Sequence, residues 1–293
     1  MAQGADLSYD AIELGKSYGP YKYPLSERIA RILEATENPH PWHHGRSPWG
    51  PPVASPSILG SICMRFIDWI APIAPGTLHA RQDVRTDAAL RLDRQPIAYG
   101  TFVEKYERRR RRWAVFEARF RDETGLIIGH GRTTMAFPER VETADERAEK
   151  GDPKPAERKG ELTPITRTIT QEKMTGFSED SANARRGTSI HINPDVAKQA
   201  GFETTIAQGM MAADYISEMM TGVLGKEWFA YADLSLTFLQ PILCGDTLTA
   251  NGRLKDETME GAVLHKGYEV WAENQRGEAV AAGSASSLVM PGR

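Results

Sequence analysis

The stretch TIAQGMMAADYISEMMTGVL, residues 205–224, decides the fold, because the same chain contains a second stretch built in the same way. Its lead-in at 205–207 precedes an apolar helical pattern from Met210 to Leu224. In the first half, 153 residues earlier, Pro52-Val53-Ala54 precedes a similar pattern from Ile58 to Ile70. A helix that recurs with the same lead-in predicts two units of similar build.

Two further pairs of segments recur in the same order. QPIAYG at 95–100 matches QPILCG at 240–245, which lies 145 residues later. The glycines at 125 and 131 match those at 277 and 283, at a spacing of 152. Loops of different length explain the small drift in spacing, so we predict an internal duplication. The alternative is that two unrelated domains share glycine and proline at their turns.

Strand-like segments follow the helical pattern in each half. Residues 112–120, 234–238 and 267–272 alternate between apolar and polar side chains, which is typical of strands with one buried face. Turn-like sequences at 122–125 and 273–277 are each followed by another strand-like run. Strands joined by hairpins exclude a doubly wound fold. We therefore expect an α+β protein in which each half sets one long helix beside an antiparallel sheet.

The segment between the halves is charged, poor in large apolar residues and interrupted by Gly and Pro. It cannot bury enough apolar surface to fold alone. We accordingly expect three regions: a first unit at 1–138, a linker at 139–162 and a second unit at 163–293.

Composition excludes several classes of protein. A net charge of -3 and a pI near 6.2 argue against a nucleic-acid or anionic-membrane binder. Cys63 and Cys244 have no zinc-site or disulfide spacing, and no apolar run is long enough to cross a bilayer. Asp6, Asp10 and Glu13 do not suit a signal peptide. We expect a cytoplasmic protein with no metal, no nucleic-acid partner and no membrane contact.

Two clusters of titratable residues invite other interpretations. The histidines in Asn38-Pro39-His40-Pro41-Trp42-His43-His44 could suggest a metal, but their spacing fits no standard ligand set. The run from Arg108 to Arg112 alternates between the two faces of a strand and is diluted by acidic neighbours, which indicates solvated side chains. The alternative for this run is a contact with the phosphoadenosine end of coenzyme A.

The most informative segment is SIHINPDVAKQAGF at 189–202, followed by IAQGMM at 206–211. It resembles the signature of the MaoC-like (R)-specific enoyl-thioester hydratases and dehydratases, a hot-dog-fold family. The resemblance covers most of 165–290 and, more weakly, 20–138. Duplicated members of that family are known, so it implies a double hot-dog: two tandem units, each a long central helix wrapped by an antiparallel sheet.

The resemblance also implies site residues. His191 falls on the family's catalytic His, and Gly209 on the glycine at the head of the central helix. The family's catalytic Asp lies five residues ahead of the His; here the nearest candidates are Asp180 and Asn183, separated from His191 by a longer loop. Where the family has a His before the glycine, this chain has Gln208, which can form hydrogen bonds but does not titrate.

Physical chemistry supports the same assignment. His191, with an ordinary pKa of about 6.5, can handle a proton near neutral pH. The backbone N–H near Gly209, at a helix N-terminus, can polarise a thioester carbonyl. We assign Asp180 as a catalytic partner and Asn183, Gln208 and Met210 to substrate binding. The alternatives that assign no function to these residues are a loop position for His191, a solvated Asp180 and core packing for Met210.

Counting back by 153 residues places Asn38 opposite His191, so a histidine is not strictly retained in the first half. His40 or His43 could occupy that position if the loop differs in length. We expect the first unit to be degenerate and to serve as the lid and the acyl-binding side.

These observations predict a hydro-lyase that adds water to, or removes it from, the 2,3 double bond of an acyl-CoA thioester without a metal or redox cofactor. An acyl-carrier-protein thioester remains an open alternative as the substrate. The rival functions are a hot-dog thioesterase and a non-catalytic subunit of a heteromeric hydratase. A homodimer is also open, since the sheet edges of hot-dog proteins often pair.

Overall fold

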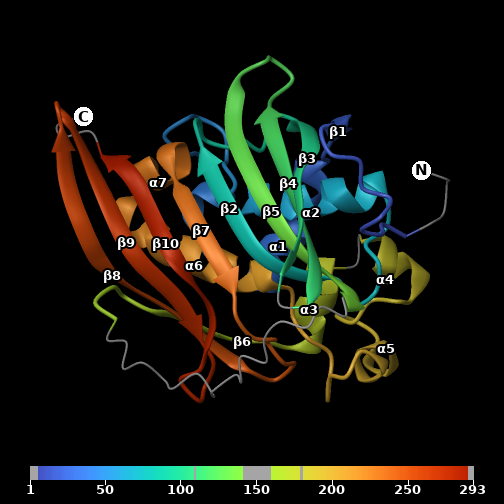
Figure 1. Ribbon diagram of the computed structural model, residues 1–293. Helices are drawn as coiled ribbons and strands as arrows, with labels where there is room; N and C mark the ends of the chain where they lie inside the picture. Colours follow the sequence, from blue (N-terminus) through green and yellow to red (C-terminus); the bar gives the residue numbers. More distant parts are fainter. Residues whose placement is uncertain (1–5, 109, 141–159, 179–180, 290–293) are drawn as a thin grey trace.

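The computed structural model describes residues 6–108, 110–140, 160–178 and 181–289. Most of the expected linker, residues 141–159, lies outside them. One antiparallel sheet of ten strands extends through the described parts, and the long helices cover one of its faces (Figure 1).

The sheet is built symmetrically from the two halves. Read outward from the centre, the first half runs β2, β5, β4, β3, β1, and the second half runs β7, β10, β9, β8, β6. When the five strands of each half are numbered along the chain, both halves have the same order from the centre outward: second, fifth, fourth, third, first. This shared topology supports the duplication. The bounds are β1 (Ser17–Lys22), β2 (Leu78–Thr86), β3 (Ile97–Arg108), β4 (Arg111–Arg121), β5 (Ile127–Arg140), β6 (Ile165–Thr168), β7 (Asp233–Phe238), β8 (Thr247–Glu260), β9 (Val263–Glu273) and β10 (Ala279–Val289).

The two halves meet at β2 and β7, whose pairing runs from Arg81 opposite Thr237 to Arg85 opposite Asp233. Every pairing between the ten strands is antiparallel. The expected hairpin-connected sheet of an α+β protein is therefore confirmed. β5 continues to Arg140, two residues beyond the expected end of the first unit at 138.

Two long helices form the centre of the core, one from each half. They are α2 (Ile58–Ile70) and α6 (Gly209–Leu224), and both agree with the helical patterns of the sequence. Each buried Ile or Leu contributes roughly 1.5–3 kcal/mol through apolar surface removed from water. The helices approach closely at Gly60, where a Cβ would lie 2.8 Å from Met210 Cε. A larger residue at position 60 would have to displace the side chains of Met210 and Gln82.

Shorter helices surround this core. α1 (Leu25–Thr36) and α3 (Gln171–Ser178) follow the first strand of their halves and pack against each other. The others are a 3-10 turn at Pro41–His43, α4 (Ala182–Arg186), α5 (Pro194–Gln199) and α7 (Lys226–Tyr231). No helix in the described parts of the chain is long and apolar enough to cross a membrane.

Candidate active site

His191 lies on the turn between α4 and α5, and its backbone is held from two sides. Its N–H donates to Ser189 Oγ at 3.2 Å, and its carbonyl accepts from Gln171 Nε2 at 2.9 Å. Two residues later, Asn193 caps α5 by accepting from the N–H of Asp195 at 3.0 Å. The histidine is therefore placed by a cap on one side and by α3 on the other.

The imidazole of His191 is fixed by a backbone carbonyl. Nδ1 lies 2.7 Å from the oxygen of Ile206, just before α6. A carbonyl only accepts hydrogen bonds, so Nδ1 carries the proton and Nε2 of the neutral ring has a free lone pair. Burial lowers the pKa of His191 to about 4, against the raising effect of the Ile206 bond, and the charge of Arg65 lowers it further. Near neutral pH, Nε2 can therefore act as a base.

Gly209 is the first residue of α6, whose N-terminus has no side-chain cap. Its N–H makes no hydrogen bond to a described residue. The partial positive charge of a helix N-terminus favours a developing oxyanion there. A Cβ at this position would lie 2.7 Å from Cδ1 of Phe238, so the close packing of β7 requires glycine.

Gln208 precedes Gly209 and carries two unsatisfied polar atoms. Both its Nε2 and its Oε1 are buried without a hydrogen-bond partner among the described residues. Leaving a buried polar group unpaired costs about 1–3 kcal/mol, so such groups are rare unless a ligand completes them. Gln208 can donate to and accept from a bound substrate.

The other expected site residues have different surroundings. Asp180 lies outside the described residues. Asn183 donates from Nδ2 to Ile73 O at 2.9 Å and accepts from Thr188 Oγ1 at 3.3 Å, so a substrate contact would share or replace these bonds. Met210 is buried with its methyl group towards α2, where it packs the two central helices.

The position five residues ahead of His191, where the resemblance leads one to expect Asp, is Arg186. Its guanidinium pairs with Asp6 at 2.7 Å on the protein surface. It supplies no carboxylate to the site. Within the described ranges, no three His, Cys, Asp or Glu side chains come together as a metal site.

A second histidine, in the first half, is held in the same way as His191. Nδ1 of His43 lies 2.7 Å from the carbonyl oxygen of Val53, which matches Ile206 in the repeat. Burial likewise lowers the pKa of His43 to about 4. Counting residues had placed Asn38 opposite His191; the counterpart is His43, because the loop between the histidine and that carbonyl is five residues shorter here.

The surroundings of His43 are closed. Phe229 of α7 is buried against it with ring centroids 5.8 Å apart, and Trp42 and Trp49 pack on the same ring. Moreover, the residue two positions after Ala54, which corresponds to Gly209, is Pro56. Proline has no N–H to offer an oxyanion. Among the described residues, therefore, only the second half combines such a histidine with a glycine at the first position of its central helix.

The chain is similar to several known proteins. A family model described as MaoC like domain matches residues 155–270. The chain is 32% identical over 96 residues to an (R)-specific enoyl-CoA hydratase of Rhodospirillum rubrum. That match covers 32% of this chain, and the chain spans 62% of the length of that relative.

Solved structures match nearly the whole chain. A MaoC-like dehydratase aligns with a TM-score of 0.71 at 15% identity, covering 97% of this chain and 99% of its own. A conserved hypothetical protein of Mycobacterium tuberculosis, described as having a double hotdog fold, aligns at 0.64 with 11% identity, covering 97% and 98%. At such identities the likeness establishes the fold, and the expected double hot-dog architecture is confirmed.

Proposed function

We propose that the protein hydrates the 2,3 double bond of an acyl-CoA thioester, or catalyses the reverse dehydration, and the match of residues 155–270 to the MaoC like domain supports this. The observation that carries the proposal is the pinned imidazole of His191, whose Nδ1 bond to Ile206 O leaves Nε2 as the base. Gly209, at the start of α6, lies next in the chain to the unsatisfied amide of Gln208.

In the hydration direction, Nε2 of His191 takes a proton from a water molecule as the water oxygen bonds to Cβ. The electron pair of the double bond moves towards the thioester, and negative charge builds on its carbonyl oxygen. The N–H of Gly209 stabilises that charge. His191 then returns a proton to Cα, so water is consumed and the base is regenerated.

Two further residues have proposed roles. We propose that the carboxylate of Asp180 holds or orients the attacking water. The amide of Gln208 bonds polar groups of the thioester or of the pantetheine arm, which satisfies both of its buried atoms. The first half, where Phe229 closes the site of His43, contributes the acyl-binding side.

The discriminating experiment uses two substrates. Incubation with crotonyl-CoA should remove the enoyl absorbance without releasing thiol, while butyryl-CoA should remain intact. A thioesterase would instead release free thiol from butyryl-CoA. A non-catalytic subunit would change neither substrate, and either of those results would overturn the proposal.

A further inference from the structure

One side chain of α3 links the two segments that hold the imidazole of His191. Gln171 begins α3, and its Nε2 donates to the carbonyl oxygen of His191 at 2.9 Å. Its Oε1 accepts from Thr205 Oγ1 at 2.6 Å. Thr205 directly precedes Ile206, whose carbonyl oxygen binds Nδ1 of His191. The amide of Gln171 therefore joins the turn that carries the histidine to the segment that fixes its ring.

These bonds allow the amide only one orientation. A backbone carbonyl only accepts hydrogen bonds, so the nitrogen of Gln171 must face His191 and its oxygen must face Thr205. The nitrogen also donates to Thr175 Oγ1 at 3.3 Å. Thr205 is buried, so its hydroxyl is satisfied by Gln171 and not by bulk water. The amide thus defines the spacing between the two segments.

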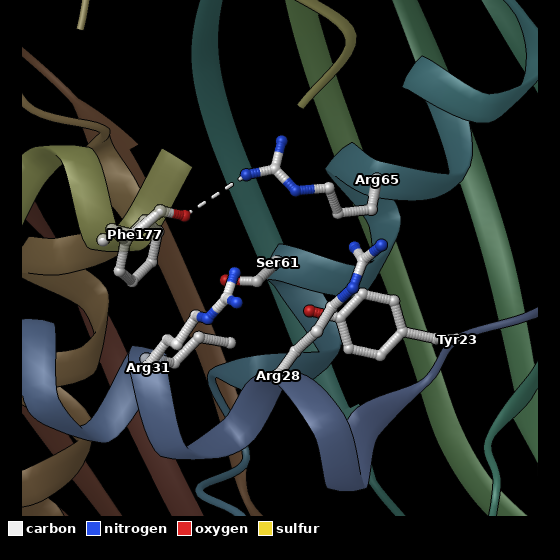
Figure 2. A pocket seen from close by; sticks show the side chains of 8 residues that line it. Tyr23, Arg28, Arg31, Ser61, Arg65 and Phe177 are labelled. Atoms are coloured by element: carbon white, nitrogen blue, oxygen red, sulfur yellow. Dashed lines mark hydrogen bonds between the residues drawn. The ribbon is translucent and has the colours of Figure 1, made fainter. Parts of the chain in front are cut away.

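The helix that carries this amide is itself held at both ends. Just before α3, the N–H of Ile169 donates to Asp246 O at 2.8 Å. Near the last turn of α3, Nη2 of Arg65 donates to Phe177 O at 3.3 Å (Figure 2). These bonds fix α3 relative to its neighbours, so the helix is a firm base for the amide.

The first half repeats the backbone part of the arrangement. In the second half, the N–H of Ile206 donates to Ile190 O at 3.3 Å. In the first half, the N–H of Val53 donates to Trp42 O at 2.9 Å. In both cases the accepting carbonyl belongs to the residue before the histidine. The backbone alone therefore brings each histidine next to the carbonyl that binds its Nδ1.

The side-chain link is not repeated in the first half. Leu25 corresponds to Gln171, because each begins its helix three residues after a strand ends. Pro52 corresponds to Thr205 at the repeat spacing of 153. Neither Leu25 nor Pro52 has a side-chain group that forms hydrogen bonds. Of the two halves, the one with the link is therefore the one whose central helix begins with Gly209.

From this asymmetry we propose that Gln171 is a positioning residue, which holds the imidazole of His191 in its place beside Ile206 O. The inference rests on the proposed function and adds a residue to it. All of the bonds of the amide go to protein groups, so Gln171 acts through His191. Misplacing a catalytic group by about 1 Å can lower a rate about a hundredfold. Loss of the amide should therefore lower kcat more than it raises KM.

The test measures crotonyl-CoA hydration by variants of the two linked side chains. Gln171→Leu, which introduces the residue of the first half, should lower kcat about tenfold or more and change KM less than about threefold. Thr205→Val removes the bond to Oε1 alone and should lower kcat by a smaller factor, about threefold to tenfold. Thr205→Ser keeps the hydroxyl and should keep kcat within about twofold of the wild type.

A second measurement asks whether Gln171 acts through His191. In His191→Ala no imidazole is left to be positioned, so adding Gln171→Leu should change the remaining rate less than about twofold. Two residues that acted independently would instead give the same loss in both backgrounds. Melting temperatures of all variants establish that the rates belong to folded protein.

Gln275 is the matched control, because its amide also joins two segments of the second half. Its Nε2 donates to Asp246 Oδ1 at 2.8 Å, and its Oε1 accepts from the N–H of Thr247 at 3.0 Å. Gln275 has no hydrogen bond to His191 or Thr205 among the described residues. Gln275→Leu should therefore keep the wild-type kcat.

The outcomes separate this inference from the proposed function. A wild type that does not hydrate crotonyl-CoA would overturn the proposed function. If the wild type is active, an unchanged kcat in Gln171→Leu, or an equal loss in both backgrounds, would overturn only the role of Gln171. The same loss in Gln275→Leu would also overturn it. If Gln171→Leu does not fold, Thr205→Val in both backgrounds decides by the same criteria.

Discussion

His191 and His43 are held identically and differ in what surrounds them. Each binds a backbone carbonyl through Nδ1 at 2.7 Å. The sequence motif around His191 predicted its importance, because SIHINPD carries a resemblance that the first half lacks. The tautomer of His191 could not be predicted from the sequence, because it depends on the carbonyl of Ile206, 15 residues away in the chain.

The lowered pKa of His191 predicts a pH profile. If His191 is the base, as proposed, it must be neutral to accept a proton. Burial lowers its pKa to about 4, so kcat/KM should stay level from pH 6 to 8 as far as His191 is concerned. Below about pH 5 the rate should fall as Nε2 becomes protonated. Initial rates with crotonyl-CoA after rapid dilution into each buffer measure this. An inflection near the ordinary histidine value of about 6.5 would contradict it.

We predict that a single methyl group added at Gly209 lowers both the rate of hydration and the stability of the protein. In Gly209→Ala, the Cβ would meet the ring of Phe238 at 2.7 Å and displace the start of α6. The rate should fall about a hundredfold, and overpacking should cost about 1–3 kcal/mol of unfolding free energy. Crotonyl-CoA kinetics and urea unfolding measure the two effects.

Gly222 provides the matched control on the same helix. A Cβ there meets no atom within 4 Å, so Gly222→Ala should keep the rate and stabilise the protein by up to about 1 kcal/mol. A similar loss of rate in both variants would show that the effect at Gly209 is not local.

Among the elements, the central helices and five of the ten described strands, namely β4, β5, β7, β9 and β10, were predicted from periodicity and turn signals, because each presents an apolar face to a shared core. The loops did not. The loop before α2 is five residues shorter than its counterpart before α6, so a fixed offset missed His43. The packing of Phe229 of α7 against His43 could not be predicted either, because Phe229 belongs to the second half and its partners belong to the first.

Removing the side chain of Phe229 should not create a second active site around His43. Phe229→Ala deletes a buried ring and should destabilise the protein by about 3–5 kcal/mol. Pro56 still offers no N–H for an oxyanion, so the double variant Phe229→Ala, His191→Ala should remain inactive with crotonyl-CoA. Recovery of hydration in the folded double variant would show that the first half retains a working site.

At the scale of the whole molecule, one core joins the two halves. A single apolar cluster includes residues from Leu7 to Ala285, and Ser55 bonds Ser217 across the halves at 2.7 Å. The repeats predicted two similar units. They could not predict the packing of α1 against α3, because only the assembled fold brings these helices of different halves together.

Asp214, buried on α6 in this shared core, should make stability depend on pH. Burial raises its pKa to about 7, Ser57 opposes the rise and Glu218 adds to it. The folded state thus holds the proton more tightly than the unfolded chain, and stability falls as pH rises from about 4 to about 7. Urea unfolding measures this. The unfolding free energy of Asp214→Asn relative to that of the wild type should rise by roughly 2–3 kcal/mol from pH 5 to pH 8.

The exposed Glu203 offers a control for the loss of one negative charge. Glu203→Gln should follow the wild type at both pH values. If Asp214→Asn also kept a constant difference from the wild type, the carboxyl of Asp214 would be ionised in the folded protein at both values.

The most direct test of the proposed chemistry compares His191→Ala with His43→Ala in crotonyl-CoA hydration. Both changes remove an imidazole and the same kind of bond to a backbone carbonyl, but only the carbonyl bonded by His191 is followed, three residues later, by a glycine that begins the central helix. Measured on folded protein, His191→Ala should lose a factor of about 10²–10⁴, and His43→Ala should stay within about threefold of the wild type. A loss of less than about tenfold for His191→Ala, about 1.4 kcal/mol, or equal losses for both variants, would contradict the account.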